Sequence, residues 1–224
     1  MIEELIEVFS GIDEDVCCIL MEGKGKVFSA GADLEWMKRM GEASFEENYE
    51  SSLRMARMFE LIDTAPVPVV SRVHGAAIGG GIGLVAVSDI AISTADTRFG
   101  WTEVRLGLVP AVISSFTIRK IGYSYARRYF LTGEIFDGNT AYRIGLVHEL
   151  APDMEGLDER VNSIIDSLKS NGLEALRLTK ELLVNLRTIP GEDVLSYSSE
   201  IISRARATEE ARIRLRKFLE KQGK

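Results

Sequence analysis

Two loops of small residues could place backbone N–H groups around a reacting atom. The first ends at residues 31–33, with the sequence GAD, and the second contains residues 79–81, a run of three glycines. Each loop lies between a predicted strand and a predicted helix, where free N–H groups favour a developing negative charge. Glycines also let a backbone amide approach a ligand closely. Together the loops predict the paired donors of an oxyanion hole, although each alone is also what a simple turn or close packing requires.

Glu103 is the carboxylate that could move a proton. It lies between Trp101 and Val104 in a stretch that is otherwise apolar or rich in glycine. Partial burial there would raise the pKa of the carboxyl, as a general acid or base requires. Pairing with Arg98 or Arg105 explains the position of Glu103 equally well, and the residues alone leave both interpretations open.

Other common chemistries lack their residues. The two histidines, His74 and His148, do not have the spacing of metal ligands, and the adjacent Cys17 and Cys18 would point to opposite faces of a strand. Neither the serine nucleophile motif G-x-S-x-G nor the phosphate loop G-x-x-x-x-G-K-S/T occurs. Residues 81–86 match the dinucleotide pattern G-x-G-x-x-A, but four small residues separate the match from its predicted strand. We therefore expect no nicotinamide site, no metal site and no structural disulfide.

The elements that must position these residues change in kind along the chain. Strands are predicted at 16–21, 69–74, 89–93 and 145–150. Helices are predicted from about 33 to 40, at 44–62, up to 87, at 111–121 and 124–131, and then at 154–169, 172–187, 191–206 and 207–221. This order predicts an α/β core over residues 1–152, followed by a helical region over 153–224.

Composition agrees with one large globular unit. The 224 residues are 46% apolar and 27% charged. No run of about 18 apolar residues is present, as a membrane-spanning helix would need. A net charge of −7 and a pI near 5.1 argue against nucleic acid as a partner, and the acidic start of the chain does not fit a secretory signal. We expect a cytoplasmic protein that binds neither nucleic acid nor a membrane.

Five spaced motifs resemble the crotonase (enoyl-CoA hydratase/isomerase) superfamily, and residues 33–40, 83–85 and 135–137 resemble its bacterial methylglutaconyl-CoA hydratase-like members. The motifs are FSAGADL at 28–34, GAAIGGG at 75–81, FGWTEVRLGLVP at 99–110, LTG at 131–133 and GLV at 145–147. The resemblance covers nearly the whole chain. It implies a spiral of ββα turns, with C-terminal helices that build a homotrimer or a dimer of trimers. It also implies that the first strands of the family's core are missing from this N-terminus.

The resemblance also implies roles for individual residues. The N–H groups of Ala32 and Gly80 would hold the thioester carbonyl oxygen of an acyl-CoA, and Glu103 would be the catalytic acid and base. Gly83 stands where many hydratases carry a second glutamate. The substrate-binding residues would be Ala30, Asp33, Leu34, Gly79, Phe218 and Lys221, the last two reaching the CoA of a neighbouring subunit.

The activity expected from this resemblance is reversible hydration of a 2-enoyl-CoA. A branched or carboxylated acyl chain such as 3-methylglutaconyl-CoA is expected, which would place the protein in fatty acid metabolism or leucine degradation. No metal or redox cofactor is expected, since coenzyme A is part of the substrate. One alternative is a Δ3-Δ2 enoyl-CoA isomerase, which also works with one glutamate. Another is a non-catalytic acyl-CoA or RNA-binding homologue, although the acidic segment 41–50 disfavours RNA.

Overall fold

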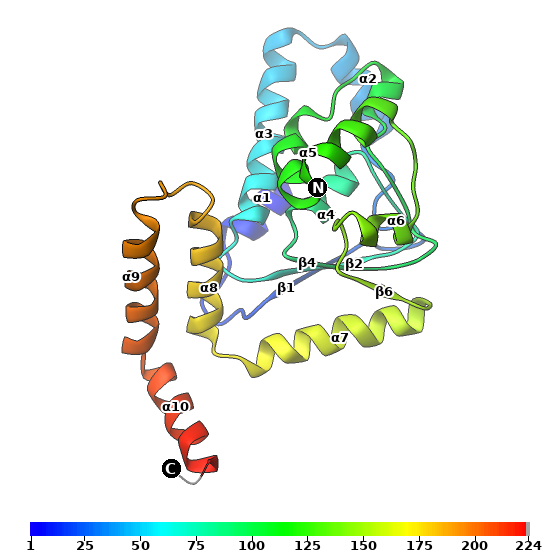
Figure 1. The fold of residues 1–224 in the computed structure, drawn as a ribbon. Coiled ribbons are helices and arrows are strands. Elements are labelled where there is room, and N and C mark those ends of the chain that lie inside the picture. Colours follow the sequence, from blue (N-terminus) through cyan, green and yellow to red (C-terminus); the bar gives the residue numbers. More distant parts are fainter. Residues whose placement is uncertain (223–224) are drawn as a thin grey trace.

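The computed structural model describes residues 1–222 and contains a four-stranded parallel sheet in the order β1-β2-β4-β6. These strands are β1 (Ile19–Glu22), β2 (Val69–Val73), β4 (Ile90–Thr94) and β6 (Glu149–Ala151). The register places Ile19 beside Val69 and Val70 beside Ile90. Helices cover both faces of the sheet (Figure 1), and the adjacent Val69 and Val70, whose side chains point to opposite faces, are both fully buried. Burial on both faces explains why these strands are recognisable as nearly continuous apolar runs.

A smaller parallel sheet pairs β3 (Ala76–Ile78) with β5 (Arg98–Gly100). Isolated bridges extend this sheet, because Ser29 pairs with Ala77 and Phe99 pairs with Phe136. Neither β3 nor β5 is predicted from the sequence, since each has only three residues and a weak apolar pattern. The small sheet joins the first small-residue loop, the glycine run and the segment that leads to Glu103.

Helices pack on the two faces of the main sheet in different numbers (Figure 1). One face carries α1 (Ile2–Ser10), α3 (Phe45–Asp63), α4 (Gly80–Val87) and α5 (Ala111–Thr132), and the other carries α7 (Met154–Ser170). The larger apolar core lies under α3, α4 and α5 and includes Phe59, Ile82 and Trp101. A smaller core under α7 includes Val70 and Leu157. Three short helices follow the loops: α2 (Leu34–Glu42), η1 (Glu103–Leu106) and α6 (Gly138–Arg143).

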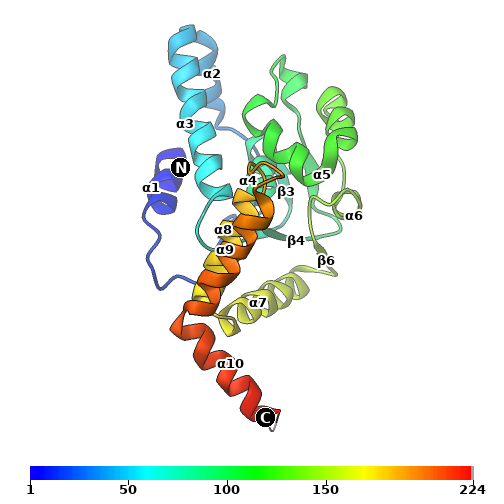
Figure 2. The ribbon, with the colours of Figure 1, turned by 60° about the vertical axis from the view of Figure 1, so that its left-hand side comes forward.

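The last three helices lie beside the core (Figure 1), and the third of them extends away from it (Figure 2). They are α8 (Leu173–Asn185), α9 (Val194–Ala207) and α10 (Glu209–Lys221). Lys180 of α8 forms an ion pair with Asp89 at 2.5 Å, and Arg177 donates to the carbonyl oxygens of Asp13 and Glu14. These contacts anchor α8 on the core. By contrast, α10 packs on α9 and leaves apolar side chains such as Leu215 exposed.

Several predicted boundaries differ from those in the structure. The first strand begins at Ile19, so Cys17 and Cys18 precede it, with 3.7 Å between their sulfur atoms. The last strand, β6, begins at Glu149, because Leu146 and Val147 are buried in a loop. The helices predicted at 111–121 and 124–131 form one helix, α5, which is kinked at Gly122. Within residues 1–222, no helix has the length and apolar character needed to cross a membrane.

Candidate active site

Three chain segments meet at Gly79. The Ile78 N–H donates to the Ser29 carbonyl oxygen at 3.1 Å, which sets the first loop against β3. The Gly79 N–H donates to the Gly100 carbonyl oxygen at 3.0 Å, which sets the segment before Glu103 against the same point. The small sheet therefore brings two distant segments to Gly79. The loop at 31–33 lies about 50 residues before Gly79 in the sequence, and Glu103 lies about 20 residues after it.

Glycine is required where these segments touch. Gly31 and Gly79 have positive φ angles of 107° and 54°, a region that other residues rarely adopt. A Cβ atom at Gly81 would lie 2.5 Å from the Ser29 side chain. Ser29 was not among the predicted site residues, and its position just before Ala30 gave no signal of this contact. The dinucleotide pattern at 81–86 lies in the buried helix α4, and the Ser29 side chain packs directly against Gly81.

The N–H groups of Ala32 and Gly80 donate no hydrogen bond to a protein acceptor within residues 1–222. Gly80 is the first residue of α4, and its cap residue Gly79 offers no side chain to accept from it. The first N–H groups of a helix carry partial positive charge and attract anionic oxygen. Both small-residue loops therefore present a free backbone donor, and the Gly80 donor has the helix N-terminus behind it.

The carboxylate of Glu103 lies beside Gly79. Glu103 is the first residue of η1, and its Oε1 lies 3.6 Å from where a Cβ of Gly79 would be. Its Oε2 is buried and has no hydrogen-bond partner among the described residues. Burial raises the pKa of the Glu103 carboxyl, and its own backbone N–H opposes this more weakly. No ion pair joins Glu103 to Arg98 or Arg105 within residues 1–222.

The position of Gly83 is filled by apolar side chains. Gly83 is buried in α4, and a Cβ atom there would lie 2.5 Å from Ile113 and 3.0 Å from the Phe59 ring. A carboxylate at this position would need both neighbours to move. Glu103 is thus the acidic side chain that the structure places beside Gly79, with no second acid on the facing turn of α4.

The predicted substrate-binding residues fall into two groups. Ala30 and Leu34 lie exposed on either side of Ala32, while Asp33 caps α2 by accepting a hydrogen bond from the Trp36 N–H at 2.8 Å. A hollow of about 540 Å³ runs along α2 from Asp33. Phe218 and Lys221 lie on α10, at the end of the molecule away from α2 (Figure 2). Within one chain they do not approach Glu103.

Comparison with known proteins finds relatives along the whole chain. A family model described as enoyl-CoA hydratase/isomerase matches residues 1–224. A Thermus thermophilus protein, named provisionally as an enoyl-CoA hydratase, is 36% identical over 209 residues, covering 93% of this chain and 82% of its own length. The structure of an enoyl-CoA hydratase from Shewanella pealeana is 38% identical, with a TM-score of 0.91 over 98% of this chain and 83% of that one. Pseudomonas aeruginosa AtuE is 33% identical, with a TM-score of 0.95 over 99% and 86%. These matches confirm the predicted α/β fold and the resemblance to the enoyl-CoA hydratase/isomerase superfamily.

Proposed function

This chain belongs to the enoyl-CoA hydratase/isomerase family, and on that basis we propose that it adds water reversibly to the double bond of a 2-enoyl-CoA. The names of its relatives from Thermus thermophilus and Shewanella pealeana support the reaction. The observation that carries the proposal is the buried, unpartnered Oε2 of Glu103 beside the free amide end of α4. A buried carboxylate without a partner is costly for folding, which suggests that substrate and water supply its missing partner.

In the proposed reaction, the thioester carbonyl oxygen lies between the N–H groups of Ala32 and Gly80. Water attacks the β-carbon, and the charge that moves onto the carbonyl oxygen is held there as an enolate. Glu103 takes a proton from the attacking water and returns one to the α-carbon. One base thus serves both proton transfers, which suits a chain with Gly83 in place of a second acid. No step in this scheme uses a metal or a redox cofactor.

The oxyanion-hole donors and the general base each make a contribution of known typical size to the reaction rate. Removing one donor of an oxyanion hole typically slows a reaction by roughly a hundred- to a thousand-fold. A positioned general acid or base contributes roughly a hundred- to ten-thousand-fold. Contacts with the CoA portion add binding energy far from the reacting carbons and hold the acyl group in place. Ala30, Asp33, Leu34 and Gly79 are the residues we assign to that binding within one chain.

The acyl chain that we propose is branched or carboxylated, as in 3-methylglutaconyl-CoA. This proposal rests on the resemblance of residues 33–40, 83–85 and 135–137, which include the glycine at position 83, to the methylglutaconyl-CoA hydratase-like members. A second candidate activity is Δ3-Δ2 enoyl-CoA isomerisation, in which Glu103 would carry one proton between the α- and γ-carbons. The apolar filling around Gly83 favours this alternative, because Ile113 and Phe59 offer no polar partner for an attacking water.

Parallel assays with crotonyl-CoA, 3-methylglutaconyl-CoA and a 3-enoyl-CoA test the proposal. Product mass separates hydration, which adds one water, from isomerisation, which leaves the mass unchanged. Hydration of 3-methylglutaconyl-CoA with a higher kcat/KM than crotonyl-CoA is the expected result. Conversion of the 3-enoyl-CoA alone would establish the isomerase instead. Binding of all three thioesters without turnover would show a non-catalytic homologue.

We also propose that the working form is a homotrimer or a dimer of trimers. Phe218 and Lys221 on α10 lie away from the site of their own chain (Figure 2), so they could contact CoA only in another subunit. Exposed apolar side chains on α9 and α10, including Leu195 and Leu215, offer a surface for such packing.

A further inference from the structure

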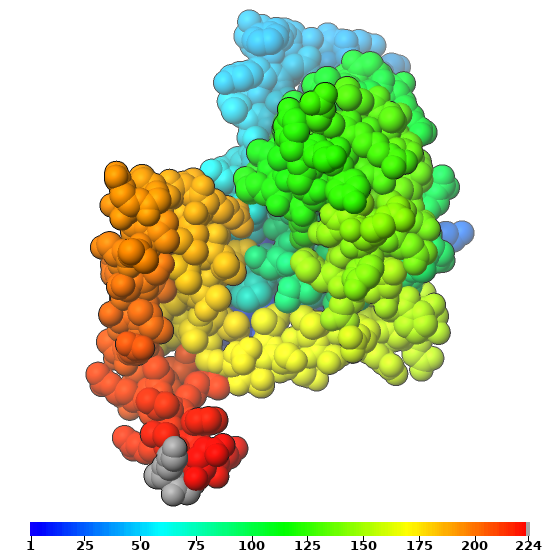
Figure 3. Space-filling view, viewed as in Figure 1, coloured from blue at the N-terminus to red at the C-terminus, as the bar shows by residue number. Residues whose placement is uncertain are grey.

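A second hollow lies at the opposite end of α4 from the proposed active site. Its volume is about 530 Å³, within the range of ligand pockets. Its lining includes Ala86, Val87 and Ser88 at the end of α4 and Phe116 on α5. Because α4 rises by about 1.5 Å per residue, this hollow is separated from Gly80 by roughly 10 Å or more. Figure 3 shows a recess between the C-terminal helices and the core.

Charged side chains from four parts of the chain surround this hollow. Asp63 ends α3, Asp89 precedes β4, Arg119 and Lys120 belong to α5, and Arg187 follows α8. Lys180 of α8 contacts Asp89 and donates to both of its carboxylate oxygens. The cluster therefore contains four cations and two anions, and its formal charge is +2 when Lys120 is protonated.

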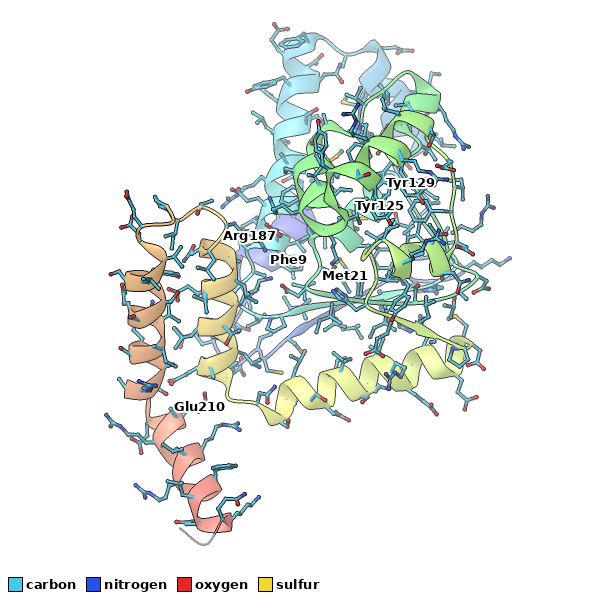
Figure 4. All side chains as sticks on the ribbon, in the orientation of Figure 1. Phe9, Met21, Tyr125, Tyr129, Arg187 and Glu210 are labelled. Atoms are coloured by element: carbon cyan, nitrogen blue, oxygen red, sulfur yellow. The ribbon has the colours of Figure 1, made fainter. Side chains whose placement is uncertain are left out.

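Arg119 and Arg187 each use one of their guanidinium N–H groups in a hydrogen bond to Asp63. Arg119 donates through Nη2 to Asp63 Oδ2 at 2.8 Å, and Arg187 donates through Nη1 to the same oxygen. The other guanidinium N–H groups of both residues have no acceptor within residues 1–222. Figure 4 shows Arg187 beyond the end of α8, on the side that faces the core. One carboxylate oxygen thus uses one donor from each of two planar forks, and each fork can bind an oxyanion with two parallel hydrogen bonds.

Lys120 adds a cation that has no ion-pair partner among the described residues. Its Nζ donates to the carbonyl oxygens of Val85, at 3.2 Å, and Ser88, both at the C-terminal end of α4. Burial and, to a lesser extent, the charge of Lys180 lower the pKa of Lys120 to about 8, although Asp89 and Asp63 act in the opposite direction. The remaining Nζ hydrogen has no acceptor among the described residues. An anion would supply the acceptor and the charge that this group lacks.

We propose that this hollow binds a small multivalent oxyanion, held by Arg119, Arg187 and Lys120. The shared chemistry is that of a phosphate group or a dicarboxylate, since both present several charged oxygens to planar and point-charge donors. The simpler explanation is that the cluster only fixes α8 on the core. That role would affect stability in every buffer alike, whereas an anion site makes stability depend on the anion.

Titration of the whole protein with inorganic phosphate, at constant ionic strength set with chloride, tests this proposal. We expect the unfolding temperature to rise with the logarithm of the phosphate concentration above its Kd, and calorimetry to give a saturating isotherm with one site per chain. Malonate in a parallel titration separates a site for carboxylates from one for phosphates. Repeating both titrations with saturating CoA separates this hollow from the proposed substrate site.

Arg187→Gln and Arg119→Gln are expected to weaken phosphate binding at least tenfold. Arg204→Gln is the matched control, because Arg204 pairs with Glu181 on the outer surface of α8 and α9. Arg187→Lys keeps the charge and the ion pair, so it should fold and bind phosphate with intermediate affinity even where Arg187→Gln unfolds. Equal phosphate dependence in all variants, or none in the parent protein, would show that the cluster is structural only.

Discussion

Glu103 shows what the structure adds to a residue that the sequence alone leaves open to two interpretations. From the sequence, pairing with a nearby arginine and a role in proton transfer were equally good explanations. Within residues 1–222, the structure joins neither Arg98 nor Arg105 to Glu103 in an ion pair, and the Oε2 of Glu103 is buried without a hydrogen-bond partner. Spacing alone cannot show which neighbour a side chain faces, because η1 turns Glu103 toward Gly79. The functional role of Glu103 remains a prediction that kinetics must test.

Glu103→Gln is expected to stabilise the folded protein near neutral pH. The pKa of Glu103 is raised above its ordinary value of 4.5, so the folded state holds this proton more tightly than the unfolded chain. Its contribution to stability is therefore complete below the unfolded pKa and is lost as pH rises through the folded pKa. Thermal unfolding of both proteins at pH 4 and pH 7.5 measures this. The variant should have the higher unfolding temperature at pH 7.5, with a smaller difference at pH 4, and a lower value at pH 7.5 would contradict the account.

Gly83→Ala is expected to destabilise the protein by about 1–3 kcal/mol, because its Cβ would press on Ile113 and Phe59. Gly41→Ala is the matched control, since Gly41 lies in α2 with open space around its missing Cβ. That change should be neutral or stabilising by up to about 1 kcal/mol. Denaturant unfolding of the two variants compares them. Equal stabilities would show that position 83 is not closed by its apolar neighbours.

At the scale of elements, the sequence was informative where an element is long or fully buried. The runs at 69–74 and 89–93 became β2 and β4, and the glycine at position 122 lies where the two helices predicted in this region meet in α5. The three-residue strands β3 and β5 could not be predicted, because pairing across the small sheet stabilises them more than local propensity does. Their pairing is what brings the two small-residue loops together.

Lys180→Met tests how α8 is held on the core. Lys180 is buried and pairs with Asp89, whose side chain is 25% exposed. Removing one partner of a buried pair costs about 3–5 kcal/mol, and the partial exposure of Asp89 places the expected loss at the lower end. Arg204→Gln, which breaks a surface pair with Glu181, should cost about 0–1 kcal/mol. Equal losses in chemical denaturation would show that Lys180 does not anchor the helix.

At the scale of the whole molecule, the motifs predicted more than periodicity did. Composition and pattern indicated an α/β core with helices at the C-terminus, and the spaced motifs identified the family. What the sequence could not supply is the distance between α10 and the site of the same chain. The separation of Phe218 from Glu103 depends on how α8, α9 and α10 lie relative to the core (Figure 1). The division of the chain at residue 152 into two units stays a prediction.

Leu215→Glu is expected to weaken the proposed assembly. Leu215 is 60% exposed on α10, and a charge there would oppose burial against another subunit. Light scattering should give three or six chain masses for the parent protein and smaller species for the variant. Met154→Glu, at an exposed apolar residue on α7, is the control and should keep the parent mass. A monomeric parent protein would contradict the proposal and leave Phe218 and Lys221 without a site.

The most direct test of the central claim is the turnover of Glu103→Gln with crotonyl-CoA and 3-methylglutaconyl-CoA, measured alongside its affinity for CoA. If Glu103 moves the proton, kcat should fall by roughly a hundred- to ten-thousand-fold. The CoA affinity of Glu103→Gln should stay within twofold of the parent value. Glu60→Gln, a control at an exposed residue of α3, should keep both its kcat and its CoA affinity within twofold of the parent values. Hydration by Glu103→Gln at the parent rate would contradict the account.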